Sequence, residues 1–318
     1  MSTRLSTLIA LLLSTGLLLG GCQPSGPEVP SYEFDTAWGT AGTEPGQFDK
    51  PIGIEIAGGE IFVSEAGNRR VQVFDGEGQA LRQIGPVLAN GDTLRRPMHI
   101  AVSGSTLYVP DFNTDRVHVL SQSGEHQRVF DGAELEKGFD APGGVAVDAN
   151  GRLYVADFYT HRVVRFANDG SFDRQWGTVD STGKAPERFT YPTDVAVHPG
   201  GGFVVADAYN HRIKRYDADG SLAWIRPEDR NWEGSEGGQF NVATAVATGP
   251  AGKIYVADFY NHRIQVFSAD GRFLTAFGEP GEGKGQFERP VDVTVDEDGT
   301  LYVVDFGNDR IQIFAPES

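Results

Sequence analysis

The chain of 318 residues contains one cysteine, Cys22. A single thiol cannot form a disulfide within the chain, which excludes a small fold held together by disulfide bridges. The residues that follow Cys22 are numerous enough to bury a hydrophobic core without such bridges. Positive charge is also scarce, because 27 Lys and Arg residues stand against 44 Asp and Glu and give a formal net charge of −17. A chain of this charge repels phosphate backbones, so we expect no nucleic acid among its partners.

Helical patterning and the common catalytic motifs are absent as well. No segment after residue 21 keeps an apolar period of 3.6 residues, so long helices are not expected. The sequence has no Gly-x-Ser-x-Gly, His-Glu-x-x-His or P-loop motif, which excludes enzymes that depend on these signatures. The one long, mostly apolar run covers residues 5–19 and follows Arg4. It is too short and wrongly flanked for a transmembrane helix, and it predicts a secretory signal peptide over residues 1–21.

The signal segment ends in Leu19-Gly20-Gly21-Cys22, which resembles the lipobox of bacterial lipoproteins. In such signals the cysteine becomes the lipidated N-terminus, and a lone thiol in a secreted chain favours this over the alternative, ordinary signal cleavage. By the same resemblance, Gln23 in place of an Asp after the cysteine favours the outer membrane. Residues 22–31 contain three prolines and predict an extended tether. We therefore expect attachment to the membrane through a lipid on Cys22, in the bacterial cell envelope.

A six-residue pattern that begins with an acid and ends with an arginine occurs six times. Its arginines are spaced 46 to 51 residues apart. A period of this size predicts a repeat architecture. The copies are Glu65–Arg70, Asp111–Arg116, Asp157–Arg162, Asp207–Arg212, Asp258–Arg263 and Asp305–Arg310.

Each repeat is predicted to contain four short strands. In the fifth repeat the strands are expected at residues 242–247, 253–257, 263–267 and 273–277, because these runs are apolar and β-prone and are separated by Gly, Asp and Asn. Four strands per period are typical of a β-propeller blade. Six repeats therefore predict an all-β fold over residues 32–318: a six-bladed β-propeller of four-stranded antiparallel blades.

The two ends of the chain predict how the ring closes. The sixth repeat stops after its third strand, at Phe314. Residues 32–39 precede the first repeat and are similar to the fourth strands of other repeats. We expect this N-terminal strand to complete the last blade, because the third strand of that blade would otherwise be an open sheet edge.

The repeats also resemble a known family. Gly-Gln-Phe, a proline a few residues later, Tyr-Val-Ala-Asp and Asn-His-Arg-Ile-Gln-Val-Phe resemble the NHL repeat over about residues 32–315. The resemblance implies a propeller that is monomeric. It leaves the activity open, since similar propellers are ligand-binding scaffolds, protein and RNA platforms, sensors and a few lyases.

A first candidate site lies where the innermost strands line the central channel. Here three repeats carry small residues and the three between them carry His99, Asp194 and Asp292. We expect these three side chains about 120° apart around the channel mouth, where one imidazole and two carboxylates could bind a divalent metal or orient a polar ligand. The alternative is that each Asp caps a turn or holds channel water. The small residues are Gly53, Gly144 and Ala245.

A second candidate site is an arc of aromatic and imidazole side chains on the top face, where the turns between second and third strands gather. Three adjacent repeats carry a Tyr and a His two residues apart in these turns. The alternative is that the turn residues serve the architecture, because Asp and Asn at such spacings bond turn backbone groups. The residues are Tyr159, His161, Tyr209, His211, Tyr260 and His262.

The resemblance to propeller enzymes is incomplete. An NHL-type amidating lyase implies several channel histidines, whereas His99 is the one histidine at the channel position. A gluconolactonase-like propeller implies Glu, Asn and Asp on a metal, and the predicted ring contains neither Glu nor Asn. We therefore predict a membrane-anchored scaffold that binds a protein or small-molecule ligand on its top face. The alternative is a metal-dependent hydrolase or lyase that uses His99 and the channel carboxylates.

Overall fold

The computed structural model describes residues 29–228 and 233–317. Cys22 and most of the predicted tether lie outside the described residues, as does the predicted signal peptide. No helix in the described part of the chain has the length and hydropathy that a membrane crossing needs.

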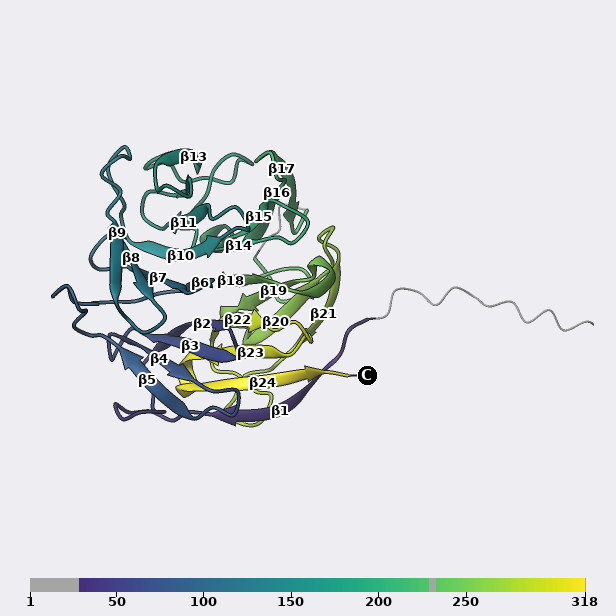
Figure 1. The fold of residues 1–318 in the computed structure, drawn as a ribbon. Helices are drawn as coiled ribbons and strands as arrows, with labels where there is room; N and C mark the ends of the chain where they lie inside the picture. The colour runs from purple at the N-terminus through teal and green to yellow at the C-terminus, as the bar shows by residue number, and fades with distance from the viewer. Residues whose placement is uncertain (1–28, 229–232, 318) are drawn as a thin grey trace, which may run out of the picture.

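In residues 29–228 and 233–317, twenty-four strands form six four-stranded sheets, each antiparallel, arranged as blades around a centre (Figure 1). The first blade comprises β2 (Pro51–Ala57), β3 (Glu60–Glu65), β4 (Arg70–Phe74) and β5 (Ala80–Ile84). The second comprises β6 (Ala101–Ser103), β7 (Thr106–Asp111), β8 (Arg116–Ser121) and β9 (His126–Phe130). The third comprises β10 (Pro142–Val147), β11 (Leu153–Asp157), β12 (Arg162–Phe166) and β13 (Phe172–Gly177).

The fourth blade comprises β14 (Asp194–Val197), β15 (Phe203–Asp207), β16 (Arg212–Tyr216) and β17 (Leu222–Arg226). The fifth comprises β18 (Ala243–Thr248), β19 (Ile254–Asp258), β20 (Arg263–Phe267) and β21 (Phe273–Phe277). The sixth comprises β22 (Pro290–Val295), β23 (Leu301–Asp305), β24 (Arg310–Pro316) and, from the other end of the chain, β1 (Tyr32–Trp38). The predicted fold class is thus confirmed, and the strands of the fifth blade lie within one residue of their predicted positions.

Helix is limited to four single 3-10 turns in the described residues. Three of them lie between the second and third strands of the last three blades. They are η1 (Ala208–Asn210), η2 (Pro250–Gly252), η3 (Phe259–Asn261) and η4 (Phe306–Asn308). The expectation that no long helix forms is therefore confirmed for the described part of the chain.

The ring closes through the N-terminal strand, as predicted. β1 pairs antiparallel with β24, from Tyr32 opposite Pro316 to Trp38 opposite Ile311. Figure 1 shows β1 beside β24 at the rim of the sixth blade. The two ends of the domain thus share one sheet, and the edge of β24 is covered.

The hydrophobic core is divided among the contacts between neighbouring blades. Each of six buried clusters combines side chains from two adjacent blades, and one joins Val117 and Phe130 of the second blade to Val155 and Phe166 of the third. Because each middle strand is covered by blades on both sides, strands such as β11 and β19 are buried along their whole length. This explains why they are continuous apolar runs in the sequence and do not alternate with polar residues.

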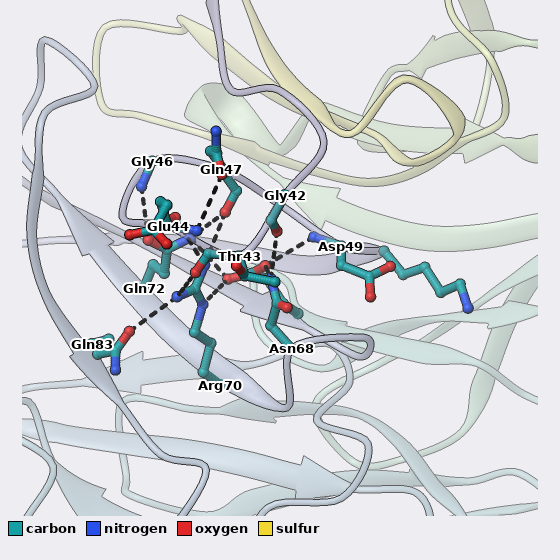
Figure 2. Close-up of polar contacts among 12 residues, drawn as sticks. Gly42, Thr43, Glu44, Gly46, Gln47, Asp49, Asn68, Arg70, Gln72 and Gln83 are labelled. Atoms are coloured by element: carbon teal, nitrogen blue, oxygen red, sulfur yellow. Dashed lines mark hydrogen bonds and ion pairs between the residues drawn. The ribbon is translucent and has the colours of Figure 1, made fainter.

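The repeated acid and arginine build a buried polar lattice. In the first blade Arg70 Nε donates to Glu65 Oε1 at 2.6 Å, and its other nitrogens donate to the carbonyls of Thr43, Glu44 and Gln47 in the preceding loop (Figure 2). Gln72 donates to both Glu65 and the carbonyl of Gln47. The arginine therefore ties the loop between two blades to the strands of its own blade, and the repeat pattern is architectural.

Candidate functional site

The innermost strands of all six blades, β2, β6, β10, β14, β18 and β22, gather at the centre of the ring (Figure 1). They enclose a cavity of about 200 Å³. Most of its lining is Val, Ala and Ile. Four ionisable side chains also line it, and they are Glu55, His99, Asp194 and Asp292.

The structure brings together the three side chains that the sequence places at the channel. One ligand atom from each of His99, Asp194 and Asp292 lies within 4.8 Å of the others. His99 Nδ1 is 3.3 Å from Asp292 Oδ2. The sequence predicts these residues at the channel mouth. They are only 4–5% exposed, so they lie inside the channel. This spacing is compatible with a shared cation, which would draw the three ligand atoms closer.

The small residues at the alternate positions make room for this cluster. A Cβ at Gly144 would lie 2.2 Å from Asp194 Oδ1, and a Cβ at Gly53 would lie 2.8 Å from the Cα of His99. Both distances are shorter than packed atoms allow, so any other residue would push the polar side chains away. The alternation of small and polar residues around the ring is therefore a packing requirement of the cluster.

The two aspartates also join neighbouring blades. Asp292 Oδ2 accepts a hydrogen bond from Ile54 N of the first blade, and Asp194 Oδ2 accepts one from Val246 N of the fifth, both at 2.9 Å. Each carboxylate thus stabilises a blade contact with one oxygen. Because a carboxylate has several lone pairs, this structural role and a ligand-binding role are compatible.

Glu55 is a further carboxyl group in the channel, outside the ring of six positions that the sequence predicts. It lies on β2 two residues after Gly53, and successive side chains of a strand alternate, so both face the channel. At the equivalent place the other five blades carry small residues. These are Ala101, Ala146, Ala196, Ala247 and Thr294. The sequence signal for Glu55 is therefore its departure from the Ala or Thr of the other repeats, at a position one layer deeper in the channel than the predicted ring.

The cavity shifts the pKa of each of three groups upward. Burial raises the pKa of Glu55 to about 8, and the charges of Asp292 and Asp194 add to the rise. Burial raises the pKa of Asp194 to about 7, although His99 opposes it. Burial lowers the pKa of His99, but Asp292 and Asp194 outweigh this, and the net pKa of His99 is above its usual value. The channel therefore holds protons close to neutral pH, as proton-transfer sites do.

Glu55→Gln is expected to stabilise the protein at high pH. Between a pKa of 4.5 in the unfolded chain and about 8 in the folded one, the folded state binds more protons, so the wild-type free energy of unfolding falls as pH rises through this window. The full shift corresponds to about 5 kcal/mol, and water in the cavity reduces the expected gain at pH 9 to about 1–3 kcal/mol. Urea unfolding at pH 4 and pH 9, with a chelator present, measures it.

The matched control is Glu60→Gln. The hydrogen bond from Arg82 lowers the pKa of Glu60, which is the opposite direction. This variant is therefore expected to gain no stability at pH 9. A Glu55→Gln protein that unfolds at the same urea concentration as wild type at both pH values would contradict the assignment of a protonated Glu55.

The histidines of the predicted arc are used as contacts between blades. The Nδ1 atoms of His161, His211 and His262 accept hydrogen bonds of 3.1–3.2 Å from backbone N–H groups of the following blade. Asp115 and Asp309 accept the same bond at the corresponding turns of two other blades. These side chains therefore support the architecture, and the structure does not collect them into one site.

The tyrosines of the arc behave differently. Tyr159, Tyr209 and Tyr260 are 46%, 52% and 55% exposed, which is unusual for large aromatic side chains. Two of them belong to an aromatic patch that we define by its five residues, which adjoin one another with ring centroids 4.8–6.1 Å apart. The aromatic patch runs from the second blade to the fourth and consists of Phe112, Phe158, Tyr159, Tyr191 and Tyr209.

Comparison with known families agrees with this geometry. The NHL repeat family matches residues 139–166 and 189–216, and a family described as 6-bladed beta-propeller matches residues 248–316. The chain contains NHL repeats in a six-bladed propeller. Protein brain tumor from Drosophila melanogaster is 30% identical over 148 residues, which are 45% of this chain and 14% of that protein. The NHL-repeat chain thus spans about a seventh of the length of this curated relative.

Solved structures resemble the NHL-repeat chain in fold. A protein of unknown function from Bacteroides thetaiotaomicron superposes with a TM-score of 0.70 at 16% identity, over 91% of this chain and 76% of that one. An auxiliary nutrient binding protein from the same organism gives 0.64 at 17% identity, over 85% and 70%. A streptogramin B lyase gives 0.58 at 13% identity, over 84% and 94%. At these identities the likeness concerns the fold alone.

Proposed function

We propose that this NHL-repeat propeller is a scaffold of the bacterial cell envelope that binds a protein partner on its top face. The observation that carries the proposal is the aromatic patch, in which Tyr159 and Tyr209 are about half exposed although they contact other rings. Tyrosine, which has both an apolar ring and a hydroxyl, is among the side chains enriched at protein interfaces and among their hot spots.

The size of the channel cavity favours a protein over a small-molecule ligand. Sites that enclose ordinary metabolites have volumes of roughly 300–1,000 Å³, whereas the cavity measures about 200 Å³ and presents His99 and three carboxyl groups. It suits water or an ion better than a metabolite. The aromatic patch, in contrast, is a broad surface on which a chain segment can lie.

Attachment to the membrane is the second part of the proposal. The lipobox-like segment that ends at Cys22 supports an N-terminal lipid, and the prolines of residues 22–31 support a tether that holds the propeller away from the bilayer. An outer-membrane location follows from Gln23 after the cysteine. The propeller would then present its top face to a partner within the envelope, as a monomer.

A photo-cross-linking amino acid in place of Tyr209 tests the binding face. In cells that produce the full lipidated protein, we expect irradiation to yield a discrete adduct with one partner protein. The same amino acid in place of Leu81, which is 51% exposed on the outer strand β5, is expected to yield no such adduct. Tyr159→Ser is expected to weaken the Tyr209 adduct at least about tenfold, since truncating a hot-spot residue costs about 2 kcal/mol or more and about 1.4 kcal/mol is a factor of ten in affinity. Equal adducts at both positions, or none at either, would contradict the proposal.

A metal-dependent hydrolase or lyase is the second candidate, and the raised pKa of Glu55 beside His99 and Asp194 favours it. A carboxyl group that holds a proton near neutral pH can serve as a general acid. Metal analysis of the purified protein and assays with lactones distinguish the candidates. Turnover that requires added metal and disappears in both His99→Ala and Asp194→Ala would support an enzyme, and metal-free protein without turnover would support the scaffold.

A further inference from the structure

The second blade holds a cluster of polar side chains outside the channel. Asp92 lies in the loop between β5 and β6, His118 on β8 and His126 on β9. One ligand atom from each of the three lies within 4.8 Å of the others. Two adjacent strands and a loop from the preceding blade connection thus converge on one point.

Three ring nitrogens of the two histidines in this cluster are buried and have no hydrogen-bond partner among the described residues. His118 is 1% exposed, and within the described residues neither of its ring nitrogens has a hydrogen-bond partner. The buried Nε2 of His126 also has none among those residues. Leaving a buried polar group unsatisfied costs about 1–3 kcal/mol, and native structures contain few such groups. Three buried ring nitrogens without hydrogen-bond partners at one place indicate that a ligand from outside the chain binds them.

The second blade has also lost the polar lattice that the other blades share. In the other five blades the arginine of the repeat contacts its acid at 2.6–2.9 Å. In the second blade Arg116 is 44% exposed and lies 3.6 Å from Asp92, while the acid Asp111 accepts from the backbone N–H groups of Arg95 and Arg96. His118 occupies the strand position where the first, fifth and sixth blades carry the lattice glutamines Gln72, Gln265 and Gln312.

We propose that Asp92, His118 and His126 form a binding site for a divalent transition-metal cation of the Zn²⁺ class. Two imidazoles and one carboxylate are the donor set that such borderline cations prefer, and a tetrahedral ion would keep one position for water. Ca²⁺ and Mg²⁺ fit poorly, because they require six or more ligands that are nearly all oxygen.

The surroundings of Asp92 suit such a site. Asn90 Nδ2 donates to Asp92 Oδ2 at 2.9 Å, and Asn90 Oδ1 accepts from Asp92 N at 3.0 Å, so the amide orients the carboxylate. Outer-shell bonds of this kind fix metal ligands in place. The Asp92 side chain is 34% exposed, which leaves a path from solvent. The exposed Arg116 can turn into solvent when a cation neutralises the carboxylate.

The cation would replace the function of the missing lattice. In the first blade Arg70 ties the preceding loop to the strands through three carbonyls. In the second blade a cation held by Asp92, His118 and His126 ties the preceding loop to β8 and β9. The same loop continues to His99 on the channel wall and then to β6. The site would therefore also fix the segment that precedes β6.

His118→Gln tests the proposal, since glutamine is the residue that three other blades use at this position. The full-length lipidated protein is stripped with a chelator and titrated with Zn²⁺ in competition with a chromophoric chelator. Removing an outer-shell partner of a metal typically costs 10–100-fold in affinity, so removing a direct ligand is expected to weaken Zn²⁺ binding by at least about 100-fold. The rise of the wild-type melting temperature on adding Zn²⁺ is expected to vanish in the variant.

Two further variants make the result decisive. Asp92→Asn changes a partly exposed side chain, so it is expected to fold even if His118→Gln does not, and to weaken Zn²⁺ binding similarly. His198→Gln in the fourth blade, where the imidazole contacts Gly252 O and Gly200 N and belongs to neither cluster, is expected to leave this binding unchanged. Unchanged affinity in Asp92→Asn, loss of binding in His198→Gln alone, or a wild-type protein without Zn²⁺ binding would each overturn the proposal.

Discussion

Removing residues 23–39, and with them β1, is expected to destabilise the propeller by about 5 kcal/mol or more, a large part of the roughly 5–15 kcal/mol that stabilises a typical domain. The strand contributes to three blades. It pairs with β24 along its length, Tyr32 contacts Tyr255 of the fifth blade, and Trp38 packs on Phe74 of the first with ring centroids 4.5 Å apart. Its loss also exposes the edge of β24, which favours aggregation. Urea unfolding of the truncated protein measures the effect.

The matched control removes residues 23–31 alone. The structure describes residues 29–31 of this segment, where Ser31 O accepts a hydrogen bond from Glu317 N and Ser31 Oγ donates one to Glu317 Oε2, and β1 begins after them at Tyr32. We expect this shorter truncation to unfold within about 1–2 kcal/mol of the protein that keeps residues 23–31, because it loses two hydrogen bonds that each contribute about 0.5–1.5 kcal/mol net. Both proteins are made without lipid. Equal unfolding midpoints for the two truncations would show that the ring does not depend on β1.

The fold could be predicted from the sequence because the same sequence pattern marks every blade. Six acid–arginine copies at a spacing of 46 to 51 residues define the blade, and the turn residues between them mark the strand ends. The incomplete sixth repeat and the strand-like residues before the first then leave one arrangement that gives every blade four strands and covers the edge of β24. Such local and periodic signals do not depend on knowing which side chains meet in space.

The sites were predicted less completely, because they depend on what differs between blades. His99, Asp194 and Asp292 could be found from their alternation around one ring, but Glu55 lies a layer deeper, where a single repeat departs from Ala or Thr. The bonds of His161 to the next blade follow from a left-handed turn, with φ of 59°, that the residue pattern does not reveal.

The cluster of the second blade shows the limit more clearly. His118 stands in a repeat position and is visible as a departure from glutamine, but Asp92 belongs to the loop before the second blade, whose sequence lacks the Gly-Gln-Phe of the loops before the first, fifth and sixth blades. The distance between Asp92 and His118 depends on the path of that loop, and the repeat pattern of the sequence does not specify this path. Only the structure places the three ligand atoms within 4.8 Å.

Arg212→Ala is expected to cost about 3–5 kcal/mol of stability, the usual effect of removing one partner from a buried ion pair. Arg212 and Asp207 are both 0% exposed, and Arg212 Nε donates to Asp207 Oδ2 at 2.6 Å. Other guanidinium nitrogens donate to backbone carbonyls of the preceding loop, including that of Lys184. The substitution removes the guanidinium from the buried Asp207 and from these carbonyls, while Thr190 N and Asn210 Nδ2 still donate to Asp207. Lys214 Nζ, 3.6 Å from Asp207, remains as a partner and keeps the loss toward the lower end.

Arg116→Ala is the matched comparison, because it changes the same repeat residue in the blade that lacks the lattice. Arg116 is 44% exposed and faces the partly exposed Asp92 across 3.6 Å, and exposed pairs contribute between zero and about 1 kcal/mol. We expect chemical unfolding of metal-free protein to place this variant within about 0.5 kcal/mol of wild type. An equal loss of unfolding free energy in Arg212→Ala and Arg116→Ala would show that the buried lattice does not stabilise the blades. The exposure of Arg116 would then be no evidence that the second blade uses His118 and His126 in place of the lattice.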